Sequence, residues 1–402
     1  MPTDALSAHP FDAITEADLR ARGGMKWTAF PDALGAFVAE MDFGTAPAVT
    51  SAVSASVDAA LFGYPPAYLI ERMQQAAADW QRDAYGWDVP ADRIRPLGDV
   101  LSGLSAVIDV FTEPGEAIVL PTPAYMPFLT LPAVHGREII QVPMLRQDDR
   151  PGAGWRLDLD GIDRAFADGG GLFLLCNPHN PIGKVYTREE MTALSEVVAR
   201  HGARVFSDEI HSPLVYPGAG GGAGHVPYAS LSPVTASHTI TATSASKAWN
   251  LPGLKCAQLI LSNDQDAETW AQSTRAMFIE HGASVPGLIA NAAAYAEGRD
   301  WLADVVTYLD GNRALMTELV AEHLPGVDFL PPEGTYLAWL DCRALGLGDH
   351  PAEFFLEHAG VAATDGCLCG DAGSGCVRFN LAMPRPILRR AVEQLGAALR
   401  AR

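Results

Sequence analysis

Residues 171–211 read GLFLLCNPHNPIGKVYTREEMTALSEVVARHGARVFSDEIH and predict a strand, a helix and a second strand in turn. The two short apolar runs are Gly171–Cys176 and Ala203–Ser207, and Arg188–His201 between them has apolar residues at three- to four-residue spacing. A strand without polar alternation is typical of a parallel sheet that is covered on both faces. The stretch therefore predicts an α/β fold with a mostly parallel sheet.

The same pattern continues on both sides of this stretch. Ala117–Leu120 and Leu259–Leu261 are further apolar strand candidates bounded by turn residues. The C-terminal part differs, because helical patterns come first and isolated strands follow. Its expected elements are helices within Leu288–His323, strands at Gly334–Leu340 and Cys376–Asn380, and a terminal helix over Pro386–Arg402. This order is typical of a smaller α+β domain.

Length and charge limit the function classes. A chain of 402 residues is longer than one core normally serves, so two domains are expected. With 28 basic and 48 acidic residues the formal net charge is −20, which argues against a protein that binds nucleic acid or an anionic membrane. One small phosphate can still be bound by a few local N–H groups. No basic and apolar leader and no long apolar span are visible, so we expect a cytoplasmic protein.

The six cysteines are expected to be reduced thiols. None forms a C-x-x-C pair, and Cys367, Cys369 and Cys376 have the wrong spacing for a zinc knuckle, with no histidine close by in the sequence. The sequence therefore predicts neither a disulfide framework nor a metal site.

Polar residues follow the predicted strands where α/β sheets bind ligands, beyond the carboxyl ends. Tyr125 comes shortly after the first strand, Asn180 lies in the two Asn-Pro turns after the second, and Asp208 ends the third, with His211 nearby. A carboxylate at a buried strand end needs a partner, such as a protonated pyridine nitrogen. Each residue also has an ordinary structural interpretation: an Asx turn for Asn180, a helix cap or turn for Asp208, and core packing for His211.

Lys247 is notable because only four of the 28 basic residues are lysines: Lys26, Lys184, Lys247 and Lys255. It lies in Thr243–Gly253 (TSASKAWNLPG), among small residues and one tryptophan, which is unusual for a solvated lysine. A desolvated amine can be neutral near pH 7 and form a Schiff base with a carbonyl. Ser244 and Ser246 could hold a phosphate, and Arg378 in a strand candidate suits a carboxylate. A buried structural lysine and an ordinary arginine salt bridge are the alternatives.

Taken together, these residues resemble the pyridoxal-phosphate (PLP) enzymes of fold type I, the class I/II aminotransferase superfamily. Within that superfamily the chain resembles the cystathionine β-lyase, or C–S lyase, branch. The pieces typical of the branch are Lys26-Trp27, Ala39–Phe43, Phe62–Tyr64, Phe111–Gly115, Asn177–Gly183, Ser207–His211 and Glu333–Leu337. The resemblance implies a large α/β domain with a mostly parallel seven-stranded sheet, over residues 49–285. An N-terminal segment, 1–48, would join the small C-terminal domain, 286–402.

The resemblance also implies roles for individual residues. Lys247 matches the lysine that binds PLP covalently, and Asp208 matches the carboxylate at the pyridine nitrogen. The remaining implied PLP contacts are Asn180 and His211 at the ring oxygen, Tyr125 stacked on the ring, and Val100, Leu101, Ser244 and Lys255 at the phosphate. Tyr64 would reach the phosphate of a neighbouring subunit, which implies a homodimer with shared active sites. Arg378, with Asn180, Ala39 and Tyr64, would bind the amino-acid substrate.

The sequence departs from the branch pattern at several positions. Asp99 replaces a glycine before the phosphate-binding residues, and Lys255 stands where many relatives have an arginine. Thr364–Gly370 (TDGCLCG) replaces a usual Pro-Gly…Phe-Gly segment, and Glu40 replaces an aspartate. A carboxylate near a phosphate is unfavourable unless it caps the helix or points away.

The resemblance implies a PLP-dependent C–S β-lyase that converts a cysteine S-conjugate into a thiol, pyruvate and ammonia. The alternatives are an aminotransferase, because one carbanion can take either course, and a specialised biosynthetic lyase for a bulky conjugate, including a decarboxylating variant. Some members of the branch also bind a transcription regulator, but no feature of this sequence marks such a surface.

Overall fold

The computed structural model describes residues 9–148, 150 and 152–402 of the chain. A seven-stranded sheet forms its larger part, with strand order β2-β10-β9-β8-β7-β3-β4. The strands are β2 (Ile94–Leu97), β3 (Ala117–Thr122), β4 (Ile139–Pro143), β7 (Gly170–Cys176), β8 (Arg204–Asp208), β9 (Thr239–Thr243) and β10 (Ala257–Leu261). Strand β10 runs antiparallel to both of its neighbours, β2 and β9, and the other adjacent pairs of this sheet are parallel. The mostly parallel α/β sheet is therefore confirmed.

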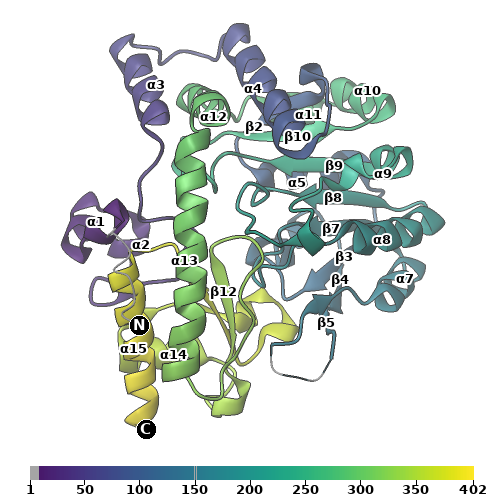
Figure 1. Ribbon diagram of the computed structural model, residues 1–402. Coiled ribbons are helices and arrows are strands. Elements are labelled where there is room, and N and C mark those ends of the chain that lie inside the picture. The colour runs from purple at the N-terminus through teal and green to yellow at the C-terminus, as the bar shows by residue number, and fades with distance from the viewer. Residues whose placement is uncertain (1–8, 149, 151) are drawn as a thin grey trace.

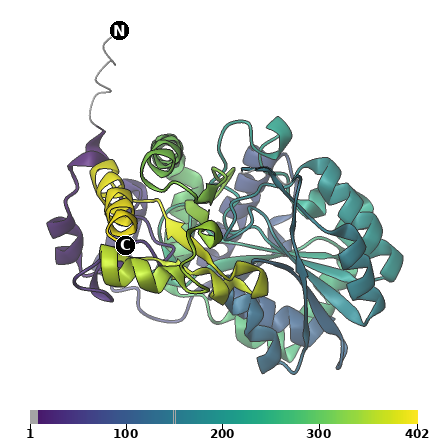
Figure 2. The same cartoon turned by 90° about the horizontal axis from the view of Figure 1, so that it is seen from below.

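Helices cover both faces of this sheet, as Figures 1 and 2 show. The helices between or beside its strands are α5 (Val100–Phe111), α6 (Leu131–Val134), α7 (Leu159–Ala167), α8 (Arg188–His201), α9 (Pro233–His238), α10 (Asp264–Gln272) and α11 (Thr274–Glu280). Along β7, Leu172 and Leu174 pack into the cluster that contains α5, whereas Phe173 and Leu175 pack into the cluster that contains α8. Burial on both faces is the reason for the continuous apolar run in the sequence.

The helix α8 begins and ends as its sequence predicts. Thr187 accepts a hydrogen bond from the Glu190 backbone N–H, and the Glu190 side chain accepts one from the Thr187 backbone N–H, which forms a capping box. Gly202 ends the helix with a φ of 63°, a left-handed conformation that glycine adopts without steric cost.

The C-terminal part contains a four-stranded sheet of order β11-β12-β15-β14. Its strands are β11 (Asp328–Phe329), β12 (Leu337–Asp341), β14 (Thr364–Asp365) and β15 (Cys376–Asn380), and its helices are α12 (Val285–Glu297), α13 (Arg299–His323), α14 (Pro351–Ala359) and α15 (Arg385–Arg400). In Figure 1, α13 runs along the side of the molecule on which the N- and C-terminal segments meet. The predicted helices and strands of this part are present, with β12 starting three residues later than expected.

The N-terminal segment joins this part through backbone pairing. Its elements are α1 (Glu16–Arg22), α2 (Met25–Thr28) and β1 (Leu34–Gly35), followed by α3 (Pro47–Asp58) and α4 (Ala67–Tyr85). Strand β1 pairs in parallel with β13 (Val361–Ala362). A separate hairpin consists of β5 (Leu145–Arg146) and β6 (Trp155–Arg156). The boundaries at residues 48 and 285 stay predictions.

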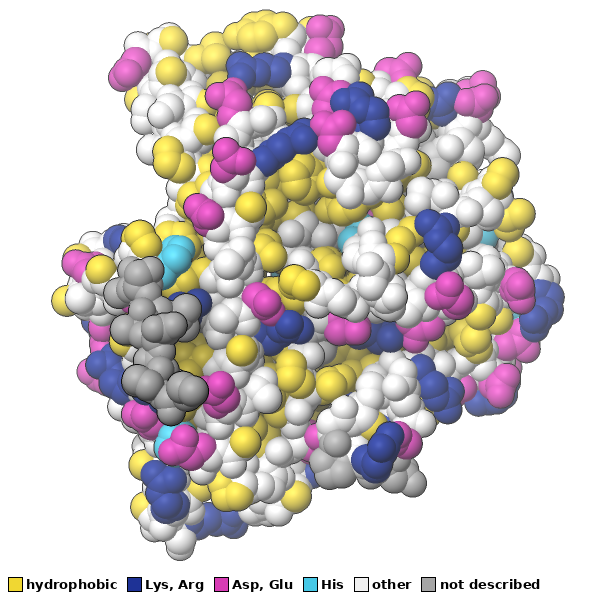
Figure 3. Space-filling view, in the orientation of Figure 1, with side chains coloured by type: hydrophobic (Ala, Val, Ile, Leu, Met, Phe, Trp, Pro, Cys, Tyr) yellow, Lys and Arg dark blue, Asp and Glu magenta, His cyan; other side chains and the backbone are white. Residues whose placement is uncertain are grey.

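Surface charges on the face shown in Figure 3 are mixed, because most lysine and arginine side chains lie beside acidic ones. Ion pairs of this kind include those of Arg82, whose guanidinium lies 2.8 Å from Asp79 and 3.0 Å from Asp83. Among the described residues, no helix is both long and apolar enough to cross a membrane.

Candidate active site

A cavity of about 640 Å³ lies where the large sheet, the small sheet and the N-terminal segment meet. Almost all of the residues singled out from the sequence line it. They are Ala39, Val100, Leu101, Tyr125, Asn180, Asp208, His211, Ser244, Lys247, Lys255 and Arg378. Tyr64 does not line it, and this residue is 97% exposed. Its predicted contact with a neighbouring subunit therefore stays a prediction.

Asp208 and Asn180 lie at the carboxyl ends of neighbouring strands. Asp208 ends β8 and is buried, and its Oδ1 accepts a hydrogen bond of 3.1 Å from the Ile210 N–H. Burial raises the pKa of Asp208 to about 7. A cation beside this carboxylate would stabilise its ionised form, because a nearby opposite charge favours the charged state.

Lys247 follows β9 and directs its amine toward the N-terminal segment. Its Nζ donates a hydrogen bond of 3.1 Å to the Ala39 carbonyl oxygen. Burial, and secondarily the positive charge of Arg378, lower the pKa of Lys247 to about 8. About a tenth of this amine is therefore neutral at pH 7, far more than for a solvated lysine, and the neutral amine is the form that attacks carbonyls and accepts protons.

His211 is a neutral side chain inside the cavity. Burial, together with the charges of Lys247 and Arg378, lowers the pKa of His211 to about 3. Its Nδ1 is buried and has no hydrogen-bond partner among the described residues. A buried polar atom without a partner is costly, so this nitrogen is available to a bound ligand.

Arg378 in β15 is held in place by three contacts. Its Nη2 donates to the Phe37 carbonyl oxygen at 2.8 Å and to the Thr364 hydroxyl at 3.2 Å, and its Nη1 donates to Asn180 Oδ1 at 3.3 Å. The guanidinium is buried, and its Nε has no partner among the described residues. A buried, preoriented guanidinium of this kind suits a carboxylate.

The N-terminus of α5 provides N–H groups at one end of the cavity. Asp99 is the N-cap of α5, and its Oδ1 accepts a hydrogen bond of 2.8 Å from the Ser102 N–H. Its Oδ2 lies 2.9 Å from Lys255 Nζ. The two unusual residues, Asp99 and Lys255, therefore form an ion pair with each other. The capping role explains how a carboxylate is tolerated at this position.

Ser244 is already engaged within the chain. Its Oγ donates to the Cys256 carbonyl oxygen at 2.7 Å and accepts from the Ser246 N–H at 3.0 Å. Ser246 lines the same cavity. To donate a hydrogen bond to a phosphate, the Ser244 hydroxyl would have to give up its hydrogen bond to the Cys256 carbonyl oxygen.

Two side chains at the site had no role assigned from the sequence. The buried Tyr336 hydroxyl donates a hydrogen bond of 2.9 Å to the Ala39 carbonyl oxygen, the group that also accepts from Lys247. The Thr364 hydroxyl accepts a hydrogen bond from Arg378 and donates one of 2.9 Å to the Phe37 carbonyl oxygen. The motif Glu333–Leu337 contained a signal for Tyr336, whereas Thr364 lies in the segment that departs from the branch pattern.

Comparison with known proteins agrees with this geometry. Residues 38–395 match the family model for class I and II aminotransferases. The chain belongs to the class I and II aminotransferase family. It is 37% identical to the cystathionine β-lyase of Corynebacterium glutamicum, over 95% of this chain and 98% of that protein. It is 32% identical to the cystathionine β-lyase PatB of Bacillus subtilis, over 92% and 93% respectively.

The solved structures that resemble the chain include the PLP-bound C–S lyase from Staphylococcus hominis. The TM-score is 0.87 at 26% sequence identity, and the alignment covers 97% of this chain and 99% of that one. Together with the curated relatives, this match places the chain in the C–S lyase branch of the aminotransferase family, as the sequence motifs predicted.

The site residues fit PLP, the cofactor of that C–S lyase. The buried Asp208 carboxylate suits a cationic ring nitrogen, and the unpartnered His211 Nδ1 lies in the same cavity. The partly neutral Lys247 amine suits an aldehyde. The N–H groups at the start of α5 suit a phosphate.

Proposed function

We propose that this protein is a PLP-dependent C–S β-lyase, which cleaves a cystathionine-like L-cysteine S-conjugate into a thiol, pyruvate and ammonia. The observation that carries the proposal is the meeting of Lys247, Asp208 and Arg378 in one cavity of a chain from the cystathionine β-lyase branch. These three groups supply a base, a counter-charge and a carboxylate receptor.

In this proposal each end of the cofactor has its own residues. Asp208 would hold the ring nitrogen, His211 and Asn180 would contact the ring oxygen, and Tyr125 would pack against the ring. Val100, Leu101, Ser244 and Lys255 would hold the phosphate. When bound, PLP withdraws electrons from the α-carbon of the substrate.

The residues of this chain supply positioning and proton transfer. Arg378, with Asn180 beside it, binds the substrate carboxylate and fixes the orientation of the α-carbon, with Ala39 forming part of the wall. Lys247 accepts the α-proton as its neutral amine. The electrons of the broken C–H bond form the α,β double bond, and the thiolate leaves with the electron pair of the C–S bond. Addition of water to the released aminoacrylate gives pyruvate and ammonia.

The test is the stoichiometry of products without an added keto acid. Purified holoenzyme with cystathionine, or with an S-alkyl cysteine, should release thiol and pyruvate in equal amounts. Lys247→Ala should abolish both. Turnover that depends strictly on a keto acid, with no thiol release, would contradict lysis and establish transamination.

Transamination is the second candidate, because the family match itself is to aminotransferases and the α-proton step is common to both reactions. Return of the proton to the cofactor rather than loss of the thiolate would give that outcome. A specialised lyase for a bulky conjugate is a variant of the first candidate, supported by the altered segment 364–370 in the cavity wall. It predicts better turnover of a large S-conjugate than of cystathionine.

We also propose a homodimer in the cytoplasm. Several large apolar side chains are exposed on α3, α4, α11 and the segment between α3 and α4, which supports an interface there. They are Val57, Phe62, Tyr64, Tyr68, Met277 and Phe278. All six cysteines are free, which suits a reducing compartment. Light scattering should give twice the mass of one chain. In a mixed dimer, Tyr64→Ala in one subunit should weaken PLP binding in the other.

A further inference from the structure

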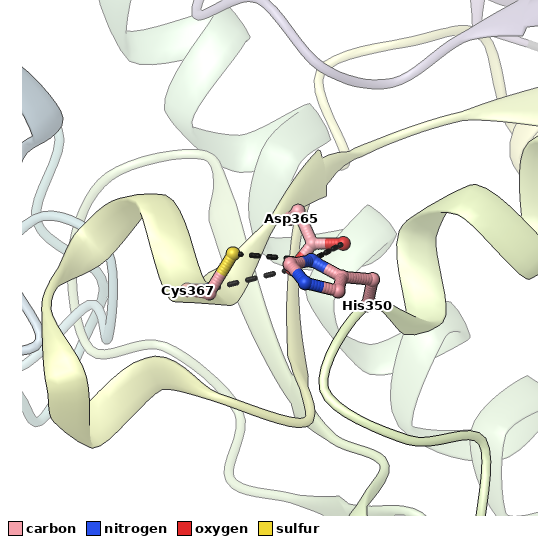
Figure 4. Close-up of side chains that lie close together, drawn as sticks. All are labelled: His350, Asp365 and Cys367. Carbon is pink, nitrogen blue, oxygen red and sulfur yellow. Dashed lines mark hydrogen bonds and ion pairs between the residues drawn. The ribbon is translucent and has the colours of Figure 1, made fainter.

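Three potential metal ligands meet beside the active-site cavity, from segments that are separate in the sequence, and one of them, Asp365, lines that cavity. His350 is the N-cap residue of α14, Asp365 ends β14, and Cys367 lies in the short 3₁₀-helix Gly366–Cys369. Figure 4 shows that their side chains point toward one another. Cys367 Sγ lies 3.3 Å from His350 Nδ1, and Asp365 Oδ2 lies 3.7 Å from the same nitrogen.

These separations are those of a tetrahedral zinc site. With ordinary Zn–S, Zn–N and Zn–O bond lengths, tetrahedral geometry places sulfur about 3.6 Å and carboxylate oxygen about 3.4 Å from the nitrogen ligand. Each observed separation lies close to the corresponding value, and all three ligand atoms lie within 4.8 Å of one another.

The surroundings of the cluster also suit a cation. Asp365 is 12% exposed in its side chain, and its Oδ2 is buried without a hydrogen-bond partner among the described residues. His350 is 55% exposed, so an ion can enter from solvent. Cys367 is the one cysteine of the six that is not buried. Cys369 and Cys376, which share the sequence cluster with Cys367, are buried and are not part of this group.

We propose that His350, Asp365 and Cys367 form a binding site for Zn²⁺ or a similar thiophilic divalent cation, with a fourth position open to water or another ligand. A set of one imidazole, one carboxylate and one thiolate is a ligand set that zinc accepts. The thiol releases its proton to solvent when it binds the ion. The bound ion carries charge opposite to the carboxylate and thiolate that hold it.

The site has a structural consequence for the active-site cavity. Ala352, Glu353 and Leu356 of α14 line that cavity, as do Asp365 at the end of β14 and Leu368 in the 3₁₀-helix that follows. An ion bound by His350 and Cys367 joins these two segments by a direct link. Metal binding therefore fixes one wall of the cavity, near Thr364 and its contact with Arg378.

The first test measures metal stoichiometry on the holoenzyme. After treatment with a chelator and dialysis against micromolar Zn²⁺, the wild-type protein should retain about one zinc per chain by elemental analysis. His350→Asn and Cys367→Ser should each lose it. His358→Asn is the matched control, because His358 lies at the other end of α14 and belongs to no such cluster among the described residues. Equal zinc content in wild type, His350→Asn and Cys367→Ser would overturn the proposal.

The second test follows the Cys367 thiol directly and does not depend on enzyme activity. The partly exposed Cys367 should be the first thiol of the folded holoenzyme to react with Ellman's reagent. Zn²⁺ should slow this reaction at least tenfold in the wild type and in His358→Asn, and should leave the rate unchanged in His350→Asn. Unprotected Cys367 in the wild type at saturating Zn²⁺ would overturn the proposal, even if every variant folds normally.

Discussion

Two of the four lysines, Lys26 and Lys247, contact the same N-terminal segment and have opposite surroundings. Lys26 Nζ lies 3.0 Å from Asp42 Oδ2 and also donates to the Ala382 carbonyl oxygen at 3.1 Å. Lys247 Nζ donates only to the Ala39 carbonyl oxygen in the described structure. Both lysines are desolvated, but only Lys26 has a carboxylate partner in direct contact. A buried lysine paired with a carboxylate stabilises the fold, whereas one without a direct counter-charge can react with a carbonyl or accept a proton.

The Lys26 pair also serves the active site indirectly. Asp42 accepts a second hydrogen bond of 2.8 Å from Trp27 Nε1, so one carboxylate connects α2 to the segment that carries Ala39. Asn380 at the end of β15 donates to the carbonyl oxygens of Val38 and Glu40 at 2.6 and 2.7 Å. These contacts fix the backbone against which both Lys247 and Tyr336 are positioned.

The largest effect on activity is expected for Lys247→Ala. Loss of the base should reduce thiol release by about 100- to 10 000-fold. The free energy of unfolding of the apoenzyme should stay the same or increase, because the substitution removes a desolvated amine without a carboxylate partner. Steady-state thiol release and urea unfolding check the two parts. A large loss of stability would mean that Lys247, like Lys26, is structural.

In contrast to Lys247→Ala, Lys26→Met should lower the stability of the fold. It leaves the buried Asp42 carboxylate without its cation, which should lower the free energy of unfolding by about 3–5 kcal/mol. Urea unfolding measures the loss, and Lys255→Met, at a 58% exposed side chain, is the matched control with little effect. In Lys26→Met/Asp42→Leu, which removes both charges, much of the loss should be recovered. A double variant as unstable as the single one would show that the charge left behind is not the cause.

The pH dependence of cofactor binding should report on Lys247. Its pKa is lowered from 10.5 to about 8, so the reactive neutral amine increases as the pH rises and becomes the main form above 8. The rate of PLP incorporation into apoenzyme should therefore rise about tenfold per unit below that value and level off above it. Stopped-flow absorbance measures the rate. A midpoint near 10.5 would indicate a solvated amine and contradict the burial argument.

The smallest effect is expected at the exposed pair of Asp99 and Lys255. Asp99→Asn keeps a side chain that caps α5 but removes the charge that occupies Lys255. Lys255 is then free for the phosphate, so PLP should bind up to about fivefold more tightly, in line with the small energy of an exposed ion pair. Equilibrium titration of the apoenzyme measures the change. Weaker binding in Asp99→Asn would show that the carboxylate supports the phosphate site in another way.

Two of the strands that the sequence pattern predicted are continuous apolar runs. Leu172–Cys176 and Ala117–Leu120 are buried on both faces, and burial of that kind leaves an apolar run in the sequence. The strand β9 was not predicted, because its sequence Thr239–Thr243 (TITAT) is rich in hydroxyl groups although every residue is buried. Thr239, for example, is accommodated because its hydroxyl donates to the Thr235 carbonyl oxygen at 2.6 Å. Such a hydrogen bond is a property of the fold and not of the local sequence.

The sequence by itself determined the α/β class and the residues that gather in the cavity, since strand-end positions and the Lys247 motif are local patterns. Only the tertiary structure decided how those residues are paired. It places Lys255 against Asp99, Thr364 against Arg378, and Lys26 and Lys247 on one segment. It also places His350 beside Cys367, although 17 positions separate them and the sequence spacing predicted no metal site. Pairing depends on distance in space, and chain separation fixes that distance only within single helices, strands and turns.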